Sequence, residues 1–92
     1  MAFDAERWRA QHDSDALMDR NPRGDMASEL LAEHLPPGTP RQEVRDLLGP
    51  PEFVDGDADV YELGRSEYGV DYEQLAIAYE DDRLLHANIR RT

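Results

Sequence analysis

The sequence contains no cysteine and no lysine, and it has no long hydrophobic run. Without cysteine the chain has no disulfide, no thiol nucleophile, no thiolate metal ligand and no residue for lipid attachment. No window approaches the ~18 consecutive apolar residues that a membrane-spanning helix needs. We therefore expect no direct insertion into a membrane.

Residues 1–15, MAFDAERWRAQHDSD, contain several acidic side chains and lack the apolar segment of a signal peptide. As written, the sequence therefore predicts a cytoplasmic protein. If a leader has been removed, the prediction becomes a periplasmic one.

Positive charge is also scarce, because 21 acidic residues face 10 arginines, for a formal net charge of −11. Phosphate binding needs clusters of cations, so this balance argues against nucleic acid, and it would also repel an anionic membrane surface. A basic protein partner fits the charge best, while the plainer alternative is that the acidity maintains solubility.

With 92 residues the chain has room for one small domain and one modest hydrophobic core. Residues 1–24 read as an N-terminal arm, with a short helix between residues 2 and 10 that displays Phe3 and Trp8. Residues 25–92 read as a single α+β domain. Its first helix is expected in DMASELLAEHL, with Asp25 as the N-cap and an end before the double proline at 36–37.

A second short helix is encoded in LPPGTPRQEVRDLLGPPE, residues 35–52. Thr39 and Gln42 have the spacing of a capping box, and Gly49 is placed for a left-handed stop before Pro50 and Pro51. About nine residues are fewer than the ~12–15 that a helix needs in water. We therefore expect its apolar stripe, Val44–Leu47–Leu48, to pack against another element.

The remaining segments alternate like strands. EFV leads through an Asp-Gly turn into DVYELG, which places Tyr61 and Leu63 on one face and Val60 on the other. In QLAIAYE the side chains of Leu75, Ile77 and Tyr79 point to one face of the strand. In the last strand, which follows the Asp81-Asp82 turn, Leu85, Ala87 and Ile89 share one face.

Such alternation predicts a sheet that is buried on one side only, as antiparallel sheets often are. The predicted fold class is α+β: two short helices on one face of a three- to four-stranded antiparallel sheet, with an N-terminal arm or short extra helix.

Three segments together resemble a known family: LPPGTPRQEVRDLLGPPEF, then VYELG, then DYEQLAIAYEDDRLLHANI. They look like the SmpA/OmlA (BamE-like) group of small bacterial domains, which is related in topology to β-lactamase inhibitor protein repeats. The resemblance covers residues 26–90, and the helix that ends in Leu-Leu-Gly-Pro-Pro is its most specific part. It implies the same two-helix and sheet arrangement, used as a non-catalytic binding module.

No motif predicts catalysis, a metal or a cofactor. DGDAD, residues 55–59, lacks the glycine and glutamate spacing of a calcium loop and reads as an acidic turn. The histidines His12, His34 and His86 stand singly, and no serine has a nucleophile-elbow setting. We therefore expect no catalytic residues, no bound metal, no cofactor and no enzymatic activity.

Four aromatic residues are the candidate interface. Tyr68 and Tyr72 lie in the polar connection GRSEYGVDYEQ, where they either bind a partner or close the end of the core. Phe3 and Trp8 either pin the arm to the sheet or await a partner. The sequence thus predicts a small protein–protein interaction module, for which scaffolding is one role. The predicted module is also compatible with a homo-oligomer. The alternative is an inhibitor or immunity-type protein that occludes a basic enzyme.

Overall fold

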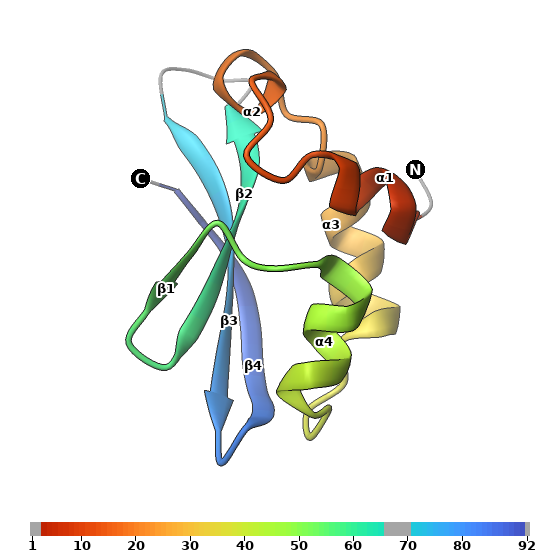
Figure 1. Ribbon diagram of the computed structural model, residues 1–92, viewed down its shortest axis with the longest axis vertical. Helices are drawn as coiled ribbons and strands as arrows, with labels where there is room; N and C mark the ends of the chain where they lie inside the picture. Colours follow the sequence, from red (N-terminus) through yellow and green to blue (C-terminus); the bar gives the residue numbers. More distant parts are fainter. Residues whose placement is uncertain (1–2, 66–70, 92) are drawn as a thin grey trace.

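The protein folds around a four-stranded antiparallel sheet with the strand order β1-β2-β3-β4 (Figure 1). The computed structural model describes residues 3–65 and 71–91. The strands are β1 (Phe53–Asp55), β2 (Ala58–Arg65), β3 (Tyr72–Glu80) and β4 (Arg83–Arg91). Each pairs with its neighbour in sequence, so the sheet is a simple meander.

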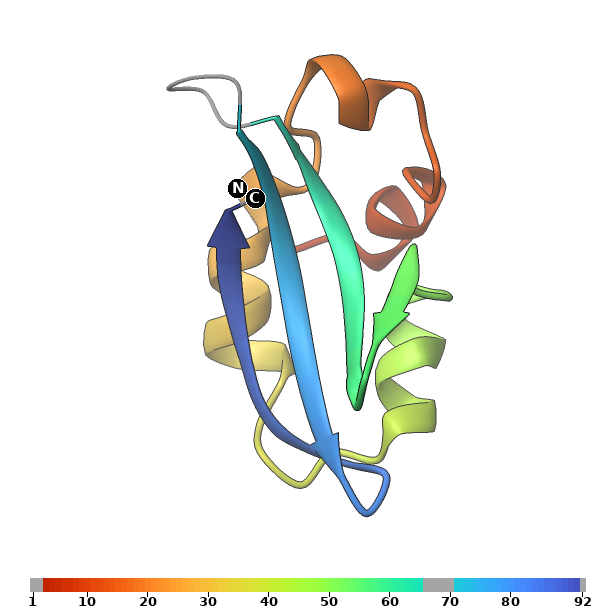
Figure 2. The same ribbon diagram turned by 90° about the vertical axis from the view of Figure 1, so that its left-hand side faces the viewer.

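The helices gather on one face of this sheet. They are α1 (Ala5–Ala10), α2 (Ala16–Asp19), α3 (Gly24–Glu29), the π-helix η1 (Leu30–His34) and α4 (Arg41–Leu48). Figure 2 looks onto the opposite face, which we call the outer face and which α1, α3, η1 and α4 leave uncovered. The α+β fold with helices packed on one side of an antiparallel sheet is therefore confirmed. No helix in the described residues is long and apolar enough to cross a membrane.

The inner face of the sheet forms the core together with the helices. The inward pattern predicted for β2 and β3 is confirmed, since Tyr61, Leu63, Leu75 and Ile77 are fully buried and Tyr79 nearly so. The prediction that the sheet is buried on one side only is wrong at its centre, where Val60, Gln74 and Ala76 on the other side are buried as well. The helical side chains that complete this cluster are Trp8, Met26, Ala27, Leu30, Val44 and Leu48.

The prediction for β4 is wrong at its first residues. Leu84 is buried and Leu85 is 49% exposed, the reverse of the expected alternation. Tyr79 pairs with Leu84 while Ala78 pairs with His86, so a β-bulge leaves Leu85 as the extra residue. One inserted residue shifts every earlier side chain to the other face, because the strand repeat is two residues.

The predicted capping box of α4 does not form. The N-cap is Pro40 and not Thr39, whose hydroxyl donates to the Pro36 carbonyl, while Gln42 donates to Asp46 within the helix. The first helical N–H, that of Arg41, donates to the Asp82 carbonyl in the β3–β4 turn at 2.8 Å. A tertiary contact thus replaces the local cap. The stop at Gly49 is confirmed, with φ at +79°.

Asp25 is not the N-cap of α3 either. That position belongs to Arg23, and Asp25 lies in the first turn, where its charge still suits the positive end of the helix. The helix begins two residues earlier than predicted, and the side chain of its N-cap residue, Arg23, is fully buried.

Candidate functional site

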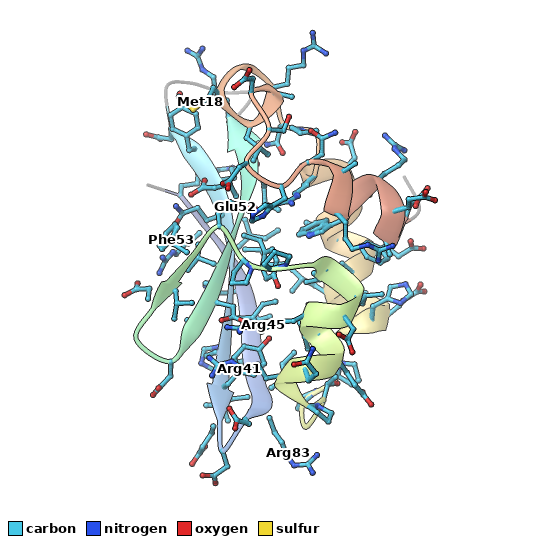
Figure 3. All side chains as sticks on the ribbon, viewed as in Figure 1. Met18, Arg41, Arg45, Glu52, Phe53 and Arg83 are labelled. Atoms are coloured by element: carbon cyan, nitrogen blue, oxygen red, sulfur yellow. The ribbon has the colours of Figure 1, made fainter. Side chains whose placement is uncertain are left out.

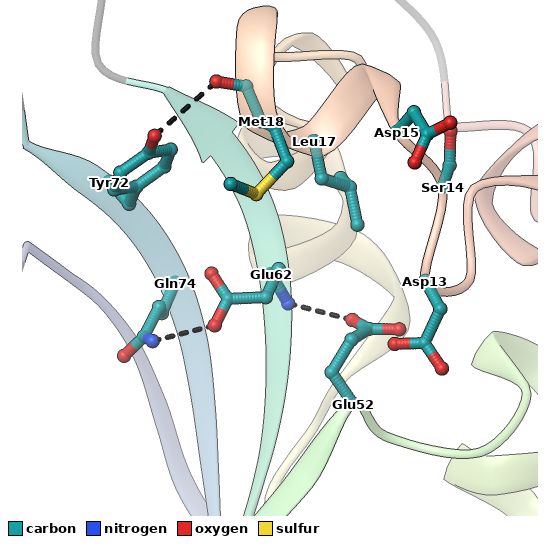
Figure 4. A pocket seen from close by; sticks show the side chains of 9 residues that line it. All are labelled: Asp13, Ser14, Asp15, Leu17, Met18, Glu52, Glu62, Tyr72 and Gln74. Carbon is teal, nitrogen blue, oxygen red and sulfur yellow. Dashed lines mark hydrogen bonds between the residues drawn. The ribbon is translucent and has the colours of Figure 1, made fainter.

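A pocket of about 540 Å³ opens at the end of the outer face, between strands β2 and β3 and the loop that carries α2 (Figure 4). It is lined by Asp13, Ser14, Asp15, Leu17, Met18, Glu52, Glu62, Tyr72 and Gln74. These residues come from four separate stretches of the chain. We call this the acidic pocket.

Local turns position the loop side of the acidic pocket. Asp13 adopts φ +51°, a left-handed conformation that aspartate tolerates better than most residues. Ser14 then accepts a hydrogen bond from the Ala16 N–H at 3.1 Å, which starts α2. The Tyr72 hydroxyl donates to the Met18 carbonyl at 3.4 Å and so ties α2 to strand β3.

Four carboxylates face the acidic pocket, and no cationic side chain of the described residues lines it. Asp15 and Glu62 form no ion pair within the described part of the chain, and Asp13 has only His12 nearby, at 3.3 Å. Like charges that converge in a concave site reinforce one another, so the pocket attracts cations.

Glu52 is the most buried of these acids, with a side chain only 6% exposed. Its Oε1 accepts hydrogen bonds from Arg23 Nη1 at 2.6 Å and from the Glu62 N–H at 2.8 Å. Its Oε2 is buried and accepts no hydrogen bond from the described residues. The Nδ1 atom of His12 lies 2.7 Å from that oxygen.

A polar ladder runs from the acidic pocket across the outer face. Gln74 donates to Glu62 at 2.7 Å and accepts from Arg90 at 3.0 Å. Arg90 also reaches Asp55 on strand β1, at 3.4 Å. The ladder links all four strands on the outer face.

Apolar groups form the rest of the wall. Leu17 is buried beneath the loop, whereas Met18 is 61% exposed and Tyr72 is half-buried. Further along the outer face Phe53, which pairs with Val60, is 41% exposed. Figure 3 shows Met18 and Phe53 on the side of the sheet away from α4. The surface therefore combines acidic and apolar contacts.

The four aromatic residues predicted as an interface are not brought together. Trp8 is fully buried in the core, against Tyr61 at 6.1 Å, which leaves it no surface for a partner. Phe3 is half-buried and packs between Trp8 and His34. Tyr72 lines the acidic pocket, and Tyr68 lies outside the described residues.

A second polar cluster pins α4 to the sheet. Asp59 is fully buried, and Arg45 binds both of its oxygens, at 2.8 and 2.7 Å. Arg41 lies 3.7 Å from the same carboxylate and stacks over the Tyr79 ring at 4.3 Å. Figure 3 shows both arginines reaching from α4 toward the strands.

The titration of this second cluster favours a structural role. Burial, and then the Asp59 charge, raise the pKa of Tyr61 and that of Tyr79 well above the ordinary value of about 10. The hydrogen bond to Asp59 raises the pKa of Arg45 in turn. The phenols stay neutral near neutral pH, and both Asp59 oxygens are held by Arg45, so this cluster anchors α4 to the sheet.

Two groups of side chains hold three potential metal ligands each within the described residues: His12 with Asp13 and Glu52, and Glu29 with Glu33 and His34. In the first group both ring nitrogens of His12 already face a carboxylate. Arg23 also occupies one oxygen of Glu52. A structural zinc site needs a fourth protein ligand, which neither group supplies.

Apart from Tyr72, no residue of the acidic pocket is predicted by a sequence pattern. Met18 belongs to a short apolar patch without helical period, and Glu52 and Glu62 look like ordinary surface acids. Their convergence depends on the packing of residues 13–18 beside strands more than 30 residues away. No family model and no curated protein matches this chain.

Proposed function

We propose that this protein is a small, non-catalytic protein-binding domain that contacts its partner through the outer face and the acidic pocket. The observation that carries the proposal is the pairing of converging carboxylates with exposed apolar side chains, Met18 and Phe53, on the outer face of the sheet. Partly exposed aromatic and methionine side chains among polar ones are typical of binding surfaces.

The resemblance to the SmpA/OmlA (BamE-like) domains supports the same class of function. It suggests that the helices and inner face are scaffold, and that the sheet presents the contact surface. Scaffolding between other proteins is a role that fits a domain of this size.

An inhibitor or immunity-type protein is the second candidate. The net charge of −11 and the acidic pocket favour a basic partner, and an inhibitor that covers a basic enzyme would use both. This alternative differs from the first in one measurable property. Binding would weaken steeply as salt is raised, with a fast association rate at low salt.

A capture experiment with matched variants tests the proposal. The immobilised protein is exposed to lysate from its host, and bound proteins are compared between wild type, Met18→Ser with Phe53→Ser, and Leu85→Ser. Leu85 is 49% exposed but belongs to the bulge at the start of β4, far along the sheet from the acidic pocket. We expect one protein to be lost with the double variant and retained with Leu85→Ser. Equal recovery with all three would contradict the proposed surface.

A further inference from the structure

We propose that the acidic pocket binds the side chain of an arginine presented by the partner protein. This inference rests on the proposed function and specifies the chemistry by which that function would work. The carboxylates of the pocket complement the guanidinium group of such a side chain, and the apolar wall complements its methylene stem.

The volume of the acidic pocket suits this occupant. About 540 Å³ lies within the ~300–1,000 Å³ of typical binding pockets, and it exceeds what one long side chain and a few waters require. The pocket is open to solvent on the outer face, so a side chain on a neighbouring protein surface can enter without any rearrangement of the fold (Figure 4).

The charge in the pocket is only partly compensated, because Arg23 pairs with Glu52 alone. Asp15 and Glu62 lack cationic partners within the described residues, and the Glu52 carboxylate lies in the wall between Glu62 and Asp13 (Figure 4). The buried Oε2 of Glu52 accepts no hydrogen bond there. His12 Nδ1 lies 2.7 Å from this oxygen, so the carboxylates open to an entering cation are those of Asp13, Asp15 and Glu62.

The apolar wall selects a long organic cation over a bare ion. Leu17 and Met18 can cover the methylene stem, and Tyr72 lines the same pocket. A divalent metal ion would gain nothing from these groups, because it prefers a shell of oxygen or nitrogen ligands.

Arginine fits better than lysine. The acceptors lie on different elements: Asp13 and Asp15 on the loop, Glu62 on strand β2 and Glu52 before strand β1. The guanidinium group presents five donors in a planar fork and stacks on aromatic rings, so it can reach several of these carboxylates at once. An ammonium group presents a single compact charge.

Methyl and amide NMR with a small probe tests this inference directly. N-acetyl-arginine amide is titrated into the full chain, and the signals of the Met18 methyl and the Tyr72 amide are followed. We expect saturable shifts at both, and none with N-acetyl-citrulline amide, which has the same shape without the charge. Glu62→Gln, which preserves an acceptor for Gln74, should weaken binding about two- to fivefold, the effect of one partly exposed charge pair.

Asp46→Asn is the matched control, since Asp46 is an exposed carboxylate on α4 that does not line the pocket. It should leave arginine binding unchanged. Equal shifts with citrulline amide, equal losses in both variants, or equally tight binding of N-acetyl-lysine amide would each overturn the assignment to arginine. The probe needs no partner, so a failed capture experiment beside a successful titration would reject the proposed function and leave the arginine site standing.

Discussion

At the scale of single residues, Arg23 is the most constrained side chain in the protein. It is fully buried, and its Nε and Nη2 both donate to the Trp8 carbonyl, at 3.1 and 3.0 Å. Its Nη1 bonds Glu52 and the Glu62 carbonyl, and the guanidinium lies 4.8 Å from the centre of the Trp8 ring. One arginine therefore joins the N-terminal arm to strand β2.

Replacement of Arg23 by methionine should lower the free energy of unfolding by about 3–5 kcal/mol, because it leaves the Glu52 charge buried without its partner. Urea unfolding measures the change. Arg91→Met is the control, since Arg91 pairs with Glu73 at an exposed position where an ion pair contributes at most about 1 kcal/mol. Similar decreases in the free energy of unfolding for the two variants would show that the buried Arg23–Glu52 pair contributes no more than an exposed ion pair.

The absence of cysteine and lysine makes the alkaline behaviour of this protein unusually simple. Between about pH 9 and 12 tyrosine is the only side chain with an ordinary pKa in range. Tyr61 is fully buried and donates to the Gly49 carbonyl at 2.7 Å. Its pKa is raised in the folded protein, so folding retains a proton that the unfolded chain releases.

Stability should therefore be unaffected by Tyr61 below pH 10 and fall as the pH rises above 10, by about 1.4 kcal/mol per pH unit for one fully shifted tyrosine. Urea unfolding at pH 8, 10 and 11 measures this slope. Tyr61→Phe lacks the ionisable group, so its stability should fall less steeply over the same range. A variant that loses stability as fast as the wild type would contradict the assignment.

At the scale of elements, the end of strand β2 is built to receive the N-terminal arm. Gly64 has φ +132°, and a Cβ placed there would meet the Arg20 carbonyl oxygen at 2.2 Å. The Arg65 N–H donates to that same carbonyl at 2.7 Å, and the Arg23 N–H donates to Leu63. The register of β2 and β3 also shifts between Glu62 and Gly64. The bulge in β2 and the absence of a side chain at Gly64 allow the backbone of β2 to contact the backbone at Arg20.

Gly64→Ala should therefore cost about 3 kcal/mol or more, since it adds backbone strain to a collision with another backbone. Thermal unfolding measures the loss, and faster amide exchange at Arg65 should report a displaced arm. Gly56→Ala is the control: φ is +63° and the space is open, so only about 1–2 kcal/mol of strain is expected. Equal costs at both positions would show that the arm does not press on the strand.

At the scale of the whole molecule, the structure ties residues 3–23 to the rest of the chain. The sequence suggests a division at residue 24, but Trp8 and Arg23 are both fully buried beside Tyr61. Trp8 is also the only tryptophan. Its fluorescence therefore reports on the arm, while far-UV circular dichroism reports largely on the helices and sheet of residues 25–92.

We expect the two signals to give the same midpoint in a urea titration, as in a single cooperative unit. The Arg23→Met variant repeats the comparison with the link between arm and sheet weakened. A fluorescence transition at clearly lower urea in the wild type would instead indicate an arm that detaches by itself. In that case residues 25–92 would form the independent domain that the sequence suggests.

The sequence by itself determined the features that local chemistry encodes. Alternation specified which side chains of β2 and β3 point toward the helices, glycine at positive φ specified the end of α4, and the paired turn residues specified two hairpins. Each of these depends on residues within a few positions of one another, so the pattern of a short window suffices.

Only the tertiary structure decided the rest. The Arg41 N–H finds its acceptor at Asp82, Leu84 turns inward through a bulge, Arg23 enters the core, and four distant carboxylates converge around Met18 and Tyr72. In each case the partner lies far away in sequence, and the residue type alone is compatible with an exposed position. Burial and pairing depend on which surfaces meet, and no local spacing records that.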